Sequence, residues 1–120
     1  MGGEAMAASN GDQNVGPPLD LRHLAEQTFG NADLEAEVLR LFLKQSSDCL
    51  DRLQVVPDAR IAHLLLGSAR GIGATAVAGA AAALEARLLR GDDGGGELAR
   101  LKGAVAATNA FIEARLGGRG

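Results

Sequence analysis

Hydrophobic residues recur at steps of three and four along most of this chain, a spacing that is typical of helices with one buried face. Capping and helix-breaking residues divide this pattern into five segments. We expect helices over residues 20–30, 31–54, 57–70, 74–90 and 97–116, with a flexible loop at 91–96. One short helix and four longer ones joined by tight connections predict an all-α fold, namely an antiparallel four-helix bundle with a short extra N-terminal helix.

The segment before the first helix has a different composition. Residues 1–18 are rich in Gly, Ala, Ser, Asn and Asp and end in Pro17-Pro18. Such a segment has too little apolar surface to offset its ordering entropy, so we expect a disordered tail at 1–18 and the bundle at 19–117. The tail lacks the basic and apolar regions of a secretory signal.

Composition narrows the class of protein. Hydrophobic residues make up 47% of the 120 residues and aromatic residues only 2%, so the core must be built from Leu, Ala and Val. A net charge of −3 and the lack of aromatic stacking platforms argue against nucleic-acid binding, and no apolar run is long enough for a bilayer span. We therefore expect a cytoplasmic monomer that binds neither nucleic acid nor membrane.

Cysteine and histidine usage gives no sign of a metal site. Cys49 cannot form an internal disulfide, and no Cys/His cluster has zinc spacing. His23 has no accompanying carboxylate pattern and is expected on the surface. We expect no resident cofactor.

The segment 67–73 (GSARGIG) is similar to the glycine-rich phosphate loop of short-chain dehydrogenases. That loop works only within a doubly wound sheet, where it places a pyrophosphate at a helix N-terminus. Nothing after Gly73 alternates like a strand, and a chain without tyrosine has no Tyr-x-x-x-Lys motif. The dehydrogenase interpretation is therefore rejected.

If the same segment belongs to a helix, some of its residues share a helix face with His63. Residues three, four and seven apart share a face, so His63 is bordered by Leu66, Gly67 and Arg70. A mid-helix glycine costs about 1 kcal/mol relative to alanine. Gly67 either leaves the imidazole uncovered for a partner or allows close helix packing beside a surface histidine, and spacing alone leaves both open.

Residues 19–116 resemble a bacterial histidine phosphotransfer (HPt) domain. The resemblance is carried by residues 41–46 (LFLKQS), 62–74 (AHLLLGSARGIGA) and 81–85 (AAALE). The core pattern of the family is His-x-Leu-Lys-Gly-Ser followed by a small residue, and it is matched at His63, Leu65, Gly67, Ser68 and Ala69.

The resemblance implies a phosphorelay protein of a two-component system. His63 would accept a phosphoryl group, usually on Nε2, from the aspartyl phosphate of a receiver domain and pass it to another receiver. Gly67 would give the receiver access, and Gln45, an amide on the apolar stripe of the second helix, would lie near the histidine or at a solvated edge. The partners would be response-regulator receivers and a hybrid sensor kinase, with Mg²⁺ supplied by the receiver.

The family lysine three residues after the histidine is replaced by Leu66. Leucine offers a phosphoryl group neither charge nor a hydrogen bond, and Arg70, with Arg60 on the other side, is the nearest substitute. We expect Leu66 to be exposed as part of an apolar docking patch, or else partly buried. The protein would be a phosphocarrier rather than an ATP-dependent enzyme; alternatively, it is a degenerate HPt-like module that binds a receiver or kinase without carrying phosphate.

Overall fold

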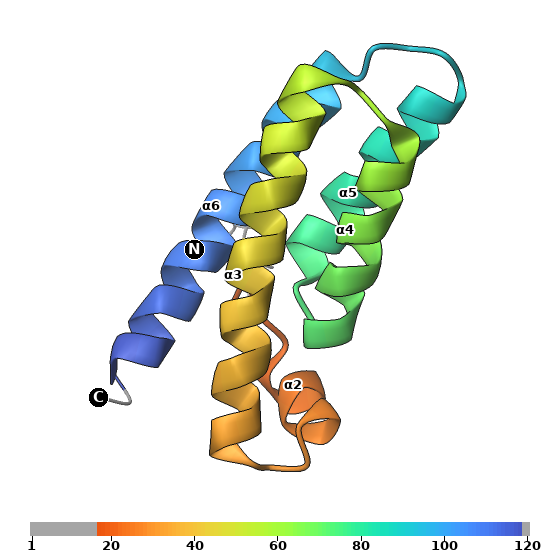
Figure 1. Ribbon diagram of the computed structural model, residues 1–120. Helices are drawn as coiled ribbons and strands as arrows, with labels where there is room; N and C mark the ends of the chain where they lie inside the picture. The colour runs from red at the N-terminus through yellow and green to blue at the C-terminus, as the bar shows by residue number, and fades with distance from the viewer. Residues whose placement is uncertain (1–16, 119–120) are drawn as a thin grey trace, which may run out of the picture.

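The computed structural model describes residues 17–118, and this part of the chain is all-helical (Figure 1). The helices are α2 (Leu21–Gln27), α3 (Ala32–Val55), α4 (Ala59–Ile72), α5 (Thr75–Leu89) and α6 (Gly95–Gly118). The predicted all-helical class is confirmed. None of these helices is both long enough and apolar enough to cross a bilayer. Most of the predicted tail, residues 1–16, lies outside the described residues.

The helix starts follow from their capping residues. The side chains of Asp20, Asn31 and Asp58 each accept a hydrogen bond from a backbone N–H in the first turn of α2, α3 and α4. These caps satisfy donors that a helix cannot satisfy internally. The predicted starts of all three helices are therefore correct to within a residue or two.

The end of α4 differs from the prediction by two residues. The helix continues through Gly71 to Ile72 and is capped by Gly73, whose φ of 77° is left-handed. A Cβ at Gly73 would lie 3.0 Å from the Cβ of Asp20, and the Gly73 carbonyl accepts a hydrogen bond of 2.8 Å from the Asp20 N–H. Only glycine tolerates both the backbone angle and this approach of the N-terminal segment.

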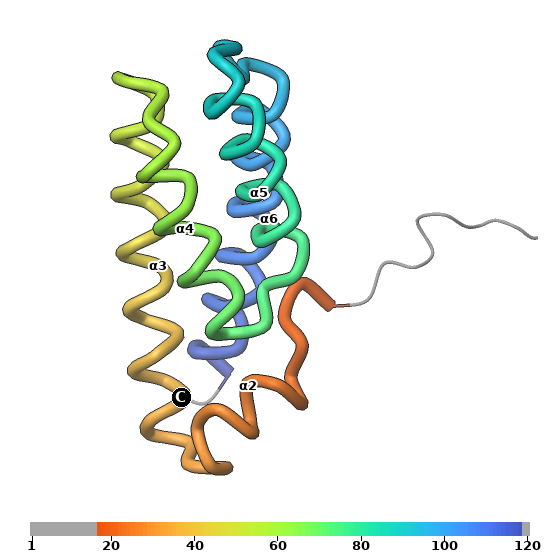
Figure 2. The backbone as a smooth tube through the Cα atoms, turned by 90° about the vertical axis from the view of Figure 1, so that its right-hand side faces the viewer, coloured from red at the N-terminus to blue at the C-terminus, as the bar shows by residue number. Residues whose placement is uncertain are grey.

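The helices form a bundle in which α4 lies between α3 and α5, and α6 packs on α5 and α3 (Figures 1 and 2). The short α2 contacts α4 near the turn between α4 and α5. Small buried residues, including Ala62 and Ala69 on α4 and Ala80 and Ala81 on α5, allow these two backbones to approach closely. Held on two sides in this way, α4 keeps one face open to solvent.

The spacing of hydrophobic residues predicts a buried stripe on α3 made of Leu34, Val38, Leu41, Phe42, Cys49 and Leu53, and the structure confirms it in part. Its fully or nearly fully buried positions are Leu39, Phe42, Ser46, Cys49 and Leu53. Leu41 was expected on this stripe but is 54% exposed, and Gln45 is exposed beside it. Because leucines occur at 39, 41 and 43, the sequence is compatible with more than one buried face of this helix. Packing against the other helices buries the face that contains Leu39.

Candidate functional site

His63 lies near the middle of α4 with 69% of its side chain exposed. Its Nδ1 is 2.9 Å from Oε2 of Glu85, a residue of α5 whose side chain is only 22% exposed. An ionised carboxylate has only acceptor positions, so Nδ1 carries the proton in this contact. In the neutral imidazole the lone pair is then on Nε2, which is the free ring nitrogen of an exposed side chain.

Glu85 also shapes the surface around the histidine. A shallow hollow of about 330 Å³ is lined by Ala59, Arg60, His63, Glu85 and Leu89. It follows the seam between α4 and α5, and Leu89 at its edge is 71% exposed. The hollow therefore brings together an oriented imidazole, a carboxylate, a cation and exposed apolar surface.

Gly67 stands one turn after His63 on the exposed side of α4. A Cβ built at this position would meet no atom within 4 Å, leaving aside the backbone of its own helix turn. The glycine is therefore not required for close packing between helices, and that alternative is wrong. The position instead leaves bare backbone beside the imidazole.

Gln45 and Ser68 contact each other rather than His63. The Ser68 hydroxyl donates a hydrogen bond of 3.1 Å to Oε1 of Gln45, which joins α4 to α3. The histidine makes its contact on the opposite flank, with α5. Of the two positions expected for Gln45, the structure has the solvated edge, where the pair helps to hold α4 in place.

Leu66 is part of the core. It is 5% exposed, so the expectation of an exposed docking residue is wrong, and its burial is more complete than the partial burial expected as the alternative. His63 lies at the border between the exposed and buried faces of α4. Leu66, three residues further along the helix, lies on the buried side of that border. The leucine of α4 that is exposed is Leu64, at 52%.

The two arginines proposed as substitutes for the lysine have different surroundings. Arg70, although exposed, lines a separate hollow near the other end of α4, together with Asp20 and His23. Arg60 lines the His63 hollow and donates from Nε and Nη2 to the carboxylate of Asp58, at 3.3 and 3.2 Å. These hydrogen bonds lower the pKa of Asp58 below its ordinary value.

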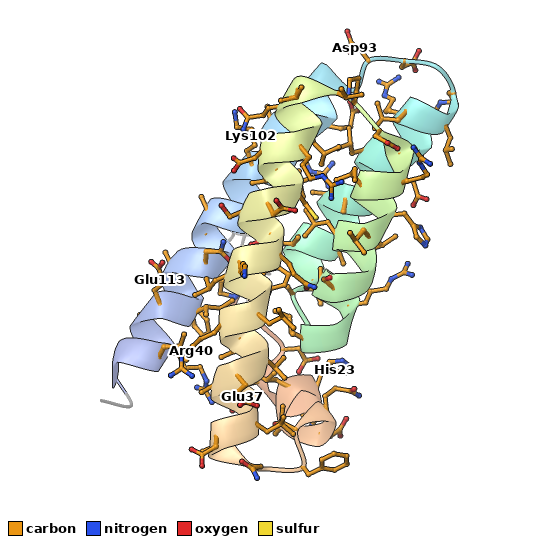
Figure 3. All side chains as sticks on the ribbon, in the orientation of Figure 1. His23, Glu37, Arg40, Asp93, Lys102 and Glu113 are labelled. Carbon is orange, nitrogen blue, oxygen red and sulfur yellow. The ribbon has the colours of Figure 1, made fainter. Side chains whose placement is uncertain are left out.

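The other candidate side chains do not form a site of this kind. His23 lies on α2 near the turn between α4 and α5 (Figure 3), partly buried rather than on the surface as expected. Cys49 is buried in the core, and burial raises the pKa of its thiol, which keeps it protonated. No group of three or more potential metal ligands occurs within residues 17–118.

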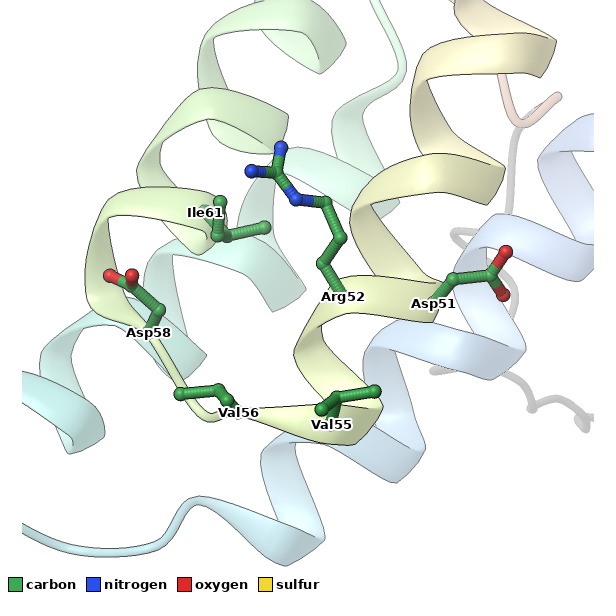
Figure 4. A pocket seen from close by; sticks show the side chains of 6 residues that line it. All are labelled: Asp51, Arg52, Val55, Val56, Asp58 and Ile61. Carbon is green, nitrogen blue, oxygen red and sulfur yellow. The ribbon is translucent and has the colours of Figure 1, made fainter.

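A second hollow, of about 540 Å³, lies at the connection between α3 and α4 (Figure 4). It is lined by Asp51, Arg52, Val55, Val56, Asp58 and Ile61. The lining holds two carboxylates and an arginine but no histidine or cysteine. It is separate from the hollow beside His63, with which it shares no lining residue.

Glu85 was not among the site residues predicted from the sequence. The signal was available: Glu85 is the only acidic residue of α5 and ends the stretch AAALE. Its pairing with a residue 22 positions earlier depends on how α4 and α5 pack, which no local pattern specifies.

Comparisons of this chain with family models, curated proteins and solved structures find no match. The features that bear on function are therefore the geometry of His63 and its surroundings, together with the residues that resemble an HPt domain.

Proposed function

We propose that this protein is a histidine phosphotransfer protein of a two-component phosphorelay. His63 accepts a phosphoryl group from the aspartyl phosphate of one receiver domain and passes it to another. In this interpretation α3 to α6 are the four antiparallel helices of an HPt bundle, and α2 is the short extra helix. The observation that carries the proposal is the exposed His63 ring, oriented through Nδ1 by Glu85.

The geometry suits attack by Nε2. Its lone pair forms a bond to phosphorus, while the bond between phosphorus and the receiver aspartate breaks and its electron pair remains on the aspartate oxygen. Nδ1 keeps its proton throughout, so the phosphorylated ring becomes a cation whose charge faces the Glu85 carboxylate. Transfer to the next receiver reverses these steps, and no proton has to leave the site.

Gly67 supports the same proposal because it leaves room for a receiver domain to reach the His63 imidazole. Phosphoryl transfer requires the donor and acceptor atoms to lie nearly in line, so a receiver must approach the imidazole closely. Any side chain at Gly67 would project from the exposed face one turn from the ring. The glycine carries a helix-propensity cost that no internal contact requires.

The receiver supplies the remaining chemistry. It provides the aspartate and the Mg²⁺ that offsets the charge of the transferring group, while this protein provides the positioned imidazole. The protein is therefore a carrier between receivers of a hybrid sensor kinase and a response regulator. It has no autokinase activity of its own.

The test is incubation of the protein with a receiver that has been phosphorylated on its aspartate. We expect label on the protein that is labile in acid and stable in base, as expected for phosphohistidine. His63→Gln should fold normally and take no label, while His23→Gln, the matched control, should be labelled as the wild type is. Equal labelling of His63→Gln would overturn the proposal, and receiver binding without any label would favour the degenerate binding module.

A further inference from the structure

The hollow beside His63 contains two opposed charges. Glu85 is an acid in contact with the ring, and Arg60 is the basic residue of the lining. Position 66, where an HPt domain is expected to have a lysine, is filled by a leucine that lies in the core. The cation available to an anion in this hollow is therefore Arg60.

Arg60 lies three residues before His63 on α4. Residues with this spacing are neighbours on one face, with Cβ atoms about 5–6 Å apart. The Arg60 side chain is 90% exposed, and its guanidinium is bonded to Asp58, whose side chain is 28% exposed. Because the arginine side of this pair lies in solvent, the ion pair is worth little in water and exchanging the partner of Arg60 costs little.

A phosphoryl group on His63 would need such a cation. It brings about two negative charges and three acceptor oxygens into a hollow that already holds the Glu85 carboxylate. A guanidinium presents several N–H donors in a planar fork, which matches phosphate oxygens. The phosphoryl group therefore competes well with the single negative charge of Asp58.

We propose that Arg60 contacts the phosphoryl group on His63 and leaves Asp58 to do so. This inference rests on the proposed function, since it concerns the phosphorylated state of the same histidine. Asp58 acts as a competitor that holds Arg60 when the histidine is free. Arg70 does not take this role, because it lines a different hollow at the other end of α4.

The first test measures the phosphoryl equilibrium between the protein and a phosphorylated receiver. We expect Arg60→Gln to shift the equilibrium several-fold toward the receiver, and the shift to shrink as salt rises. Arg70→Gln, a matched change on the same helix, should leave the equilibrium unchanged. Asp58→Asn removes the competing charge but keeps a capping oxygen for α4, so it should shift the equilibrium toward the protein.

The second test removes the receiver. Phosphoramidate phosphorylates histidine chemically, so phospho-His63 can be formed in the absence of any protein donor. We expect the Arg60 Nε–H resonance to move on phosphorylation, and the Arg70 resonance to stay in place.

The outcomes separate this inference from the proposed function. Equal equilibria for Arg60→Gln and wild type, or an unmoved Arg60 resonance in the phosphorylated protein, would overturn the role of Arg60 while leaving the carrier function intact. A protein that takes no label from the receiver but shows the Arg60 shift with phosphoramidate would overturn the carrier function and support the contact.

Discussion

His63 of α4 and Glu85 of α5 are joined by a hydrogen bond of 2.9 Å between Nδ1 and Oε2. The carboxylate is largely buried and the ring largely exposed, so the acid is fixed by the protein and the imidazole faces outward. This relationship sets which ring nitrogen carries the proton. It therefore makes Glu85 a positioning residue for the proposed chemistry.

Glu85→Ala should change both the tautomer of the His63 ring and the rate at which His63 is phosphorylated. Without the carboxylate, the ring loses its preference for a proton on Nδ1 and gains rotational freedom, so we expect phosphorylation to slow by about tenfold. Glu85→Gln keeps an acceptor oxygen and should recover part of the rate. Nitrogen-15 NMR of the ring measures the tautomer directly, and an unchanged tautomer in Glu85→Ala would contradict the positioning role.

Gly67→Ala should stabilise the protein but impair phosphoryl transfer between the protein and a receiver domain. An added Cβ meets open space and improves helix propensity, so we expect about 0.5–1 kcal/mol more stability in urea unfolding. The same methyl group should slow phosphoryl transfer from a receiver. Gly71→Ala is the control, because it lies one turn further on α4 with equally open surroundings. It should stabilise similarly without slowing transfer, and equal slowing in both would remove the access argument.

Leu66→Lys should destabilise the fold rather than restore a phosphate-binding cation. The side chain is 5% exposed, so the substitution empties a packed site and forces an ammonium group out of the core. We expect the free energy of unfolding to fall by about 2–5 kcal/mol, which is the range found when a core leucine is replaced by alanine. Leu64→Lys, at a position that is 52% exposed, should change stability by less than about 0.5 kcal/mol. Similar urea midpoints for the two variants would show that Leu66 is not a core residue in solution.

Arg115→Ala should loosen the contact between the C-terminal half of α6 and α3. Arg115 donates from Nε to Glu35 at 2.6 Å and from Nη2 at 3.2 Å, and both side chains are at least two-thirds buried. The hydrogen bonds raise the pKa of Arg115, as expected for a stabilised cation. We expect a loss of about 1–2 kcal/mol in urea unfolding. A double-mutant cycle with Glu35→Gln isolates the pairwise energy, and a coupling near zero would contradict this assignment.

The ion pair between Arg87 and Glu97 should give the stability a component that depends on pH. Arg87 of α5 donates to Glu97 of α6 at 3.0 Å, and this hydrogen bond lowers the pKa of Glu97. Because the folded-state pKa is below the unfolded-state value, the stabilisation is present above the unfolded-state pKa and is lost as pH falls through the folded-state pKa.

Glu97→Gln should therefore be slightly less stable than the wild type at pH 7 and equally stable near pH 2. Urea unfolding at the two pH values measures this difference. A difference that stays the same at both pH values would show that the ion pair is not its cause.

Sequence alone was sufficient for most of the helices. The caps Asp20, Asn31 and Asp58 act within one turn of the chain, so their effect can be inferred from neighbouring residues. The same holds for the position of His63 and Gly67 on one exposed helix face, because a helix repeats every 3.6 residues. The assignment of His63 as the candidate nucleophile needed more than this spacing, because it also depended on the resemblance of residues 62–74 to an HPt domain.

Contacts between helices were decided by packing. Glu85 reaches His63, and Gln45 reaches Ser68, across 22 and 23 positions of sequence, and no local pattern specifies such pairs. The burial of Leu66 and the exposure of Leu41 have the same origin. On a helix rich in leucine and alanine, many faces are nearly equal in apolar surface, and the face that is buried is the one that fits the neighbouring helices most closely.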